Sequence, residues 1–151
     1  MTEAHPSTRT AAGTNGRGFR VRALGEIAIR CRDRAAMERF YEEVIGLELY
    51  ARRPGGITFF KIADGYQGHT AVLALFHDEA RVAEPAPQNA FHHMALTVGW
   101  EEQAAAASHF DRLGIPYRFQ DFDWTGWRGL FVKDPEGNTV ELVAAKPGRA
   151  G

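Results

Sequence analysis

The sequence has little cysteine: Cys31 is the single thiol in 151 residues. One thiol cannot form a disulfide within the chain, so the fold depends on non-covalent contacts, and a reducing compartment is expected. Cys31 also ends an alternating apolar segment, where a cysteine usually acts as a small buried hydrophobe. We therefore expect Cys31 in the core and not as a nucleophile.

Long apolar runs and a surplus of one charge are also missing. No stretch stays apolar over the roughly 20 residues that a membrane helix needs, and the first twenty residues lack the apolar centre of a secretory signal. These absences predict a cytoplasmic protein that does not enter membranes. The 18 basic and 19 acidic side chains give a net charge of −1, without the basic surplus that nucleic acid requires.

The composition predicts one folded domain with short tails. Residues 1–20 are rich in Thr, Ala, Gly and Ser, with several arginines, and bury too little apolar area to offset chain entropy. We predict a disordered tail over 1–20, a single domain over 21–146 and a second short tail over 147–151.

Two segments show the two-residue period of a half-buried strand, at 24–31 and at 91–98. Their apolar faces carry Ile27, Ile29 and Cys31 in the first segment and Met94, Leu96 and Val98 in the second. The opposite faces carry small residues and begin with a polar one, Glu26 in the first segment and His93 in the second. This equivalence indicates an internal repeat.

A helical pattern follows each strand, over 33–45 and 100–113, with Asp33 as the expected N-cap. Gly46 and Gly114 then end the helices as left-handed residues. Gly46 lies 20 residues after Glu26, and Gly114 lies 21 after His93. The nearly equal spacing supports the repeat.

A new strand begins directly after each glycine, at Leu47 and at Ile115, and two further strands complete each copy, at 57–62 and 70–76, then at 129–133 and 139–145. The turn DPEGN at 134–138 precedes the last strand. Matching GHTAVLALF at 68–76 with GNTVELVAA at 137–145 makes Val72 the counterpart of Glu141. The predicted fold is α+β, with two βαβββ units at about 24–77 and 91–145.

Three motifs, FYEEVIGLEL at 40–49, FHHMAL at 91–96 and KDPEGNTVEL at 133–142, resemble the vicinal oxygen chelate superfamily. That group includes glyoxalases, methylmalonyl-CoA epimerases, extradiol dioxygenases, fosfomycin resistance enzymes and bleomycin-binding proteins. The resemblance covers about 24–145 and implies paired half-barrels whose concave faces meet around a metal. It also implies a homodimer, with the site either within one chain or across two.

The resemblance places metal ligands at Glu26, His93 and Glu141. The set suits a divalent ion, and residue type does not distinguish Zn, Mn, Ni, Fe or Mg. Val72 stands where many relatives supply a fourth ligand, so three ligands would leave coordination positions open to substrate. Two carboxylates nearly cancel the metal charge, which favours chelation of a substrate oxygen pair over formation of a metal hydroxide. The two glutamates are also the catalytic candidates, as proton carriers.

Other side chains are candidates for substrate binding. Trp124, Trp127 and Arg128 in WTGWRG suit a planar or anionic molecule, and the alternative is packing or a dimer contact. Phe59 is expected as a pocket wall, and His69 as an acid or base or as ordinary turn chemistry. His92 shares the apolar face of Met94 and Leu96 and is expected to be capped or partly exposed.

The leading hypothesis is a metal-dependent lyase or isomerase acting on a small molecule with neighbouring oxygens. The main alternative is a metal-free protein of the bleomycin-resistance type, in which the same three side chains form a buried hydrogen-bonded cluster. An extradiol dioxygenase is disfavoured because ferrous oxygenases usually use two histidines and one carboxylate. A purely structural dimer subunit leaves three inward polar residues without a purpose.

Overall fold

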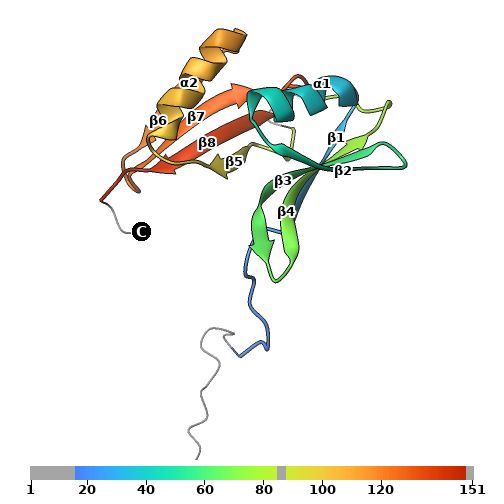
Figure 1. Cartoon of the computed structure of the whole chain (residues 1–151), viewed down its shortest axis with the longest axis horizontal. Coiled ribbons are helices and arrows are strands. Elements are labelled where there is room, and N and C mark those ends of the chain that lie inside the picture. The colour runs from blue at the N-terminus through green and yellow to red at the C-terminus, as the bar shows by residue number, and fades with distance from the viewer. Residues whose placement is uncertain (1–15, 85–87, 149–151) are drawn as a thin grey trace, which may run out of the picture.

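The computed structural model describes residues 16–84 and 88–148 (Figure 1). The predicted tail over 1–20 falls mostly on 1–15, outside the described residues. Its first unit contains β1 (Glu26–Cys31), α1 (Arg34–Arg39), the π-helical turn η1 (Phe40–Val44), β2 (Glu48–Arg53), β3 (Ile57–Tyr66) and β4 (His69–His77). Its second unit contains β5 (Met94–Thr97), α2 (Glu102–Leu113), β6 (Arg118–Phe122), β7 (Trp127–Lys133) and β8 (Thr139–Ala145). The predicted βαβββ repeat is confirmed.

Each unit builds one four-stranded sheet. The first sheet has the order β1-β4-β3-β2 and the second has the equivalent order β5-β8-β7-β6. β1 runs parallel to β4 and β5 parallel to β8, while the remaining pairs are antiparallel. Figure 1 shows α1 and α2 on the same side of the two sheets. In the described part of the chain, no helix is long and apolar enough to cross a membrane.

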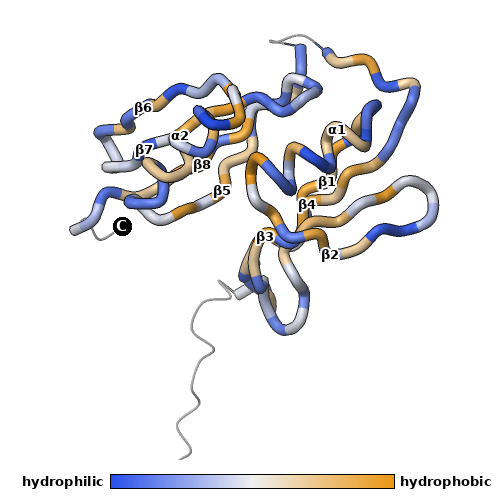
Figure 2. Tube along the Cα trace, turned by 45° about the horizontal axis from the view of Figure 1, so that its top comes forward, coloured by the Kyte–Doolittle hydropathy of each residue, from blue (hydrophilic) through white to orange (hydrophobic). Residues whose placement is uncertain are grey.

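The predicted alternation along β1 and β5 is confirmed. Glu26, Ala28 and Arg30 are exposed on one face of β1, while Cys31 on the other face is completely buried. Burial raises the pKa of the Cys31 thiol to about 11, as expected for a core cysteine. Figure 2 shows hydrophobic and hydrophilic residues interspersed along the trace of both units.

One hydrophobic core joins the two units on the helix side of the sheets. Both helices and both sheets contribute side chains with little or no exposed surface. Its largest fully buried hydrophobic members are Tyr41, Phe60, Phe110, Met37, Leu73, Leu75 and Leu130. The opposite face of each sheet, which we call its open face, carries Ala28 on β1 and Ala95 and Thr97 on β5, all exposed. Among residues 16–84 and 88–148, no further layer of secondary structure covers these two sheet faces.

The sheet registers correct the predicted counterpart of Glu141. In the second sheet Glu141 lies beside Ala95, two residues after His93. In the first sheet the residue beside Ala28, two residues after Glu26, is Ala74. The turn alignment, which chose Val72, is therefore wrong by two residues, because the loops before β4 and β8 differ in length. Since Ala74 is also apolar, the first unit still offers no ligand at the position equivalent to Glu141.

The helix ends follow the predicted chemistry. The Asp33 side chain accepts from the Ala36 backbone N–H at 3.0 Å, and Gly114 adopts the left-handed conformation at φ 66°. The first helix does not continue as an α-helix to its end, since Ile45 N–H donates to the Phe40 carbonyl five residues back. The wider turn places the adjacent Phe40 and Tyr41 together in the core.

The DPEGN turn fastens the second unit onto the first. Asp134 is 4% exposed, and its carboxylate accepts from the Glu136 and Asn138 backbone N–H groups and the Asn138 side chain. Tyr41 Oη of the first unit donates to the same carboxylate at 2.9 Å. Glu136 accepts from Arg81 and from the two backbone N–H groups before α1. The turn that precedes β8 is thus held from both units.

Tyr41→Phe tests this link. Removing the hydroxyl deletes a buried hydrogen bond to a carboxylate, and we expect the free energy of unfolding to fall by about 1–3 kcal/mol in urea titrations. Tyr117→Phe is the matched control, because its hydroxyl donates to the exposed Asp111 at 3.1 Å. A loss no larger than that of the control would show that the Tyr41 bond does not hold the units together.

Candidate metal and substrate site

Glu141 is a nearly buried carboxylate on the open face of the second sheet. It lies on β8 between Ala95 of β5 and Phe131 of β7, and is 4% exposed. Gly129 of β7 makes room for it, because a Cβ at that position would collide with Glu141 Oε1 and with the Phe131 ring. The sheet therefore contains a cradle shaped for this carboxylate.

His93 is the side chain that meets the buried carboxylate. Its Nε2 lies 3.2 Å from Glu141 Oε2, and its ring remains partly exposed. On the other side of the ring, the Nδ1 atoms of His92 and His93 are 2.7 Å apart, a hydrogen-bond distance whose donor depends on the tautomers of the two rings. A proton on His93 Nδ1, donated to His92, leaves Nε2 free to bind a cation.

Burial and charge act in opposite directions on Glu141. Desolvation raises the pKa of its carboxyl above the ordinary value, while His93 and the Arg118 guanidinium lower it in part. The net shift is upward. A nearly buried carboxylate with a raised pKa gains from any further positive charge placed on the open face.

The separation of His93 and Glu141 suits two ligands of one cation. Donors about 2.1 Å from a metal lie about 3.0 Å apart at a right angle and about 3.4 Å apart at a tetrahedral angle. The 3.2 Å between Nε2 and Oε2 falls between these values. Two of the three predicted donors therefore fit a divalent ion as they stand.

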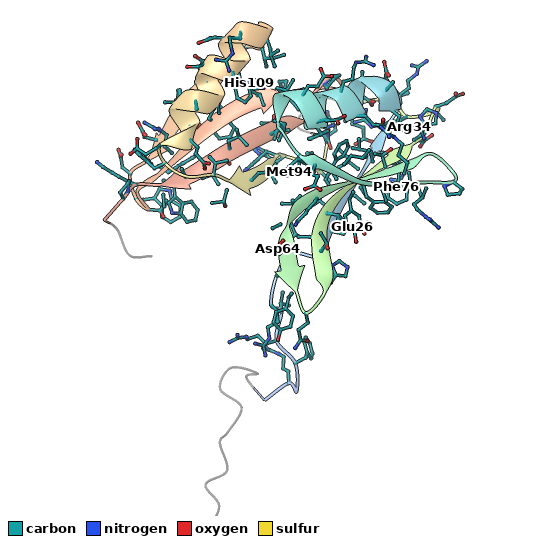
Figure 3. The ribbon with its side chains drawn as sticks, in the orientation of Figure 1. Glu26, Arg34, Asp64, Phe76, Met94 and His109 are labelled. Carbon is teal, nitrogen blue, oxygen red and sulfur yellow. The ribbon has the colours of Figure 1, made fainter. Side chains whose placement is uncertain are left out.

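Glu26 lies on the open face of the other sheet. It is exposed and sits beside Val72, in a hollow lined also by Tyr50, Phe59 and His69 of the first unit. Figure 3 shows Glu26 on the first sheet and Met94, next to His93 in the chain, on the second. Within the described residues of one chain, no three His, Cys, Asp or Glu side chains converge to hold a metal. The structure brings His93 and Glu141 together and keeps Glu26 apart.

The predicted substrate-binding residues separate into three places. Phe59 and His69 line the hollow beside Glu26. Trp127 shares the open face of the second sheet, and Trp124, which is 83% exposed, lies 6.1 Å from it between ring centroids. Arg128 lies on neither open face.

Of the two alternatives for the WTGWRG segment, the contacts of Arg128 correspond to packing. Its Nε donates to Gln103 Oε1 at 2.8 Å, and its guanidinium lies 4.0 Å from the Trp100 ring centroid and 5.1 Å from that of Phe119. Alternation along β7 points it to the helix side while Trp127 points to the open side. Arg128 therefore packs α2 against the sheet and does not reach the site.

Three site residues were not identified from the sequence as part of the site: His92, Gly129 and Arg118. His92 was placed on the apolar face by alternation, but β5 begins only at Met94, so that rule does not apply to it. Gly129 and Arg118 become visible once β6, β7 and β8 are in register, which sets Arg118, Phe131 and Glu141 in one row. The sequence alone does not give that register.

The comparison with known families agrees with this geometry. The profile of the Glyoxalase/Bleomycin resistance protein/Dioxygenase superfamily matches residues 23–142, which cover both units. The chain belongs to this superfamily. The predicted resemblance to vicinal oxygen chelate proteins is thereby confirmed.

Solved structures of the superfamily share the fold. A lactoylglutathione lyase from Agrobacterium tumefaciens is 28% identical, with a TM-score of 0.59 over 81% of this chain and 92% of its own. A glyoxalase/dioxygenase from Nostoc punctiforme is 19% identical, with a TM-score of 0.67 over 93% and 99%. The fosfomycin resistance protein FosX from Listeria monocytogenes is 16% identical, with a TM-score of 0.64 over 85% and 97%. A search of curated protein sequences found no match to this chain.

Gly129→Ala tests the carboxylate cradle. The added methyl group must displace the Glu141 carboxylate or the Phe131 ring, and we expect about 1–3 kcal/mol of lost stability in urea titrations. Gly25→Ala is the matched control in the other unit, since its Cβ would meet only the edge of the His69 ring at 3.4 Å. Equal stability of the two variants would mean that Glu141 is free to leave the cradle at no cost.

Proposed function

We propose that the protein is a metal-dependent enzyme of the superfamily, acting on a small molecule with neighbouring oxygens, and that it works as a homodimer. His93 and Glu141 of one copy would hold the ion together with Glu26 of the second copy. The observation that carries the proposal is the 3.2 Å pair of His93 Nε2 and Glu141 Oε2 on an uncovered sheet face. One more carboxylate from outside the chain completes the predicted donor set.

The two open faces support a site shared between copies. Glu26 and His93 are equivalent residues of the repeat, yet they belong to different sheets of the chain. In a twofold dimer, contact of the first sheet of one copy with the second sheet of the other occurs twice. Such a dimer covers the exposed small residues Ala28, Ala95 and Thr97 and forms two sites of three ligands each.

The side chains have distinct parts in the proposed reaction. A divalent ion held there would polarise the neighbouring oxygens of a bound substrate. Glu26, the exposed carboxylate, is suited to move a proton, while the buried Glu141 stays fixed over Gly129. Phe131 beside Glu141 excludes water on one side. Proton transfer beside polarised oxygens fits a lyase or isomerase, and the similarity to a lactoylglutathione lyase supports this class.

A second candidate is a metal-free binding protein. Glu141 already has His93 as its partner, and no described buried side-chain nitrogen or oxygen atom lacks a hydrogen bond. A chain with this arrangement can fold and hold a ligand between its sheets without an ion. Metal binding separates the two candidates.

Metal analysis after incubation with Mn²⁺, Ni²⁺ or Zn²⁺ is the direct measurement. We expect about one ion per chain in the wild type. Glu141→Ala and His93→Ala should each bind the ion at least a hundredfold more weakly, because each lacks one side chain that binds the metal directly. Glu43→Gln, an exposed helix residue, is the control and should bind as the wild type does. Folded wild-type protein that takes up no ion would favour the metal-free candidate.

Mixing two inactive variants tests whether the site is shared. Glu26→Ala and Glu141→Ala homodimers should each bind the ion at least a hundredfold more weakly than the wild type. After unfolding and refolding together in equal amounts, half of the dimers are mixed and each mixed dimer has one complete site, so about a quarter of all sites should recover. Recovery no greater than that of either variant refolded alone would contradict a site built from two copies.

A further inference from the structure

Two cations occupy the open face of the second sheet beside the candidate ligands. Arg118 on β6 faces Phe131 of β7, which in turn faces Glu141 of β8. Lys133 on β7 faces Thr139 of β8, two residues before Glu141 on the same side of the strand. Both basic side chains are exposed. Their side chains point to the same open face of the sheet as the side chain of Glu141.

The spacing between these cations and the ligands is set by the sheet. Arg118 lies two strands from Glu141, a lateral distance of about 9–10 Å between backbones. Lys133 is one strand away from β8, in the row of Thr139. The long side chains of Arg118 and Lys133 extend above the sheet, so their charged groups can lie closer to Glu141 than the backbones do. A small molecule of a few bonds can therefore reach from His93 and Glu141 to both cations.

Neither cation is neutralised by a hydrogen-bonded carboxylate in the described part of the chain. Arg118 Nη1 donates to Gln120 Oε1 at 2.8 Å, and Lys133 Nζ donates to Thr139 Oγ1 at 2.6 Å. The Arg118 guanidinium lies 4.2 Å from the centroid of the Phe131 ring, which holds it above the sheet. Each cation thus keeps donors that an anion can use.

A hollow brings these groups together. Arg118, Lys133, Phe131, Thr139 and His92 all line it, and His92 contacts the ligand candidate His93. The same hollow also contains two carboxylates and a third cation. Glu136 and Arg81 there are paired with each other at 2.8 Å, and Glu84 is exposed at the rim. Arg118 and Lys133 are the cations of this hollow whose hydrogen bonds go to neutral groups, although the charge of Arg118 also acts on the nearby Glu141.

We propose that Arg118 and Lys133 form an anion subsite that selects the substrate. The substrate class is a small molecule that chelates through neighbouring oxygens at one end and carries a carboxylate, or an equivalent oxyanion, a few bonds away. This inference rests on the proposed function, because it places the chelating end at His93 and Glu141. Phe131 supplies an apolar floor between the two ends.

A matched pair of probes tests the subsite. 2-Hydroxyglutarate and 2-hydroxypentanoate have the same five-carbon chain and the same chelating end, and differ only in the terminal carboxylate. In calorimetric titrations of the Mn²⁺-loaded protein, we expect the diacid to bind about ten- to hundredfold more tightly than the monoacid. Arg118→Gln with Lys133→Gln should weaken diacid binding far more than monoacid binding and so abolish this preference.

The controls separate local recognition from general charge. Arg118→Lys and Lys133→Arg keep the charge and should keep most of the preference. Arg112→Gln removes an exposed cation in the last turn of α2 and should change neither affinity. An equal loss of both affinities in the double glutamine variant would overturn the subsite, because it would indicate a long-range field.

The same titrations without metal distinguish this inference from the proposed function. A protein that takes up no Mn²⁺ but still prefers the diacid through Arg118 and Lys133 overturns the proposed function alone. A protein that binds Mn²⁺ but does not distinguish the two probes overturns the anion subsite alone. Failure of both probes to bind in either state also overturns the subsite.

Discussion

The buried carboxylate of Glu141 is the constraint around which the second unit is arranged. A carboxylate at 4% exposure is costly unless a partner compensates for the lost water, and His93 supplies that partner at 3.2 Å. The fold reserves space for the charge by placing Gly129 beneath it and Phe131 beside it. A core designed only for stability would place an apolar residue here. The retained charge, turned toward an uncovered face, is what points to chemistry.

The position of Glu141 depends in turn on the docking of the two units. The turn at 134–138 starts β8, and its Asp134 carboxylate is fixed by its own backbone and by Tyr41 from the first unit. Glu136 of the same turn receives the backbone N–H groups that precede α1. The start of β8 is therefore held by contacts made outside the second sheet, in addition to its pairing with β5 and β7. The pairing of β6 and β7 with β8 then fixes the positions of the side chains on the open face, including Arg118 two strands away.

Sequence reasoning predicted the features that depend on local period and on turn chemistry. The two strands of alternating residues, the Asp33 cap, the Gly114 helix end and the repeat all follow from neighbours along the chain. Pairing between strands does not, and so the counterpart of Glu141 was placed two residues from Ala74. For a related reason the sequence left packing and substrate binding both open for Arg128, since successive residues along β7 point to opposite faces of the sheet. The role of Arg118 needs three strands in register, which no local pattern in the sequence provides.

The division of the ligands between the units links assembly to the proposed chemistry. Each sheet presents part of the proposed donor set on a face that the described residues leave open, Glu26 on one and His93 with Glu141 on the other. If the open faces of the two units of one chain packed against each other, the ligand site would need no second chain. Here the two units are joined through the core on the helix side of the sheets, and not through their open faces. The open faces are therefore available for another molecule. If the donors meet across two copies, the surface that forms the dimer interface also encloses the substrate. Arg118 and Lys133 would then determine which end of the substrate lies against the second sheet.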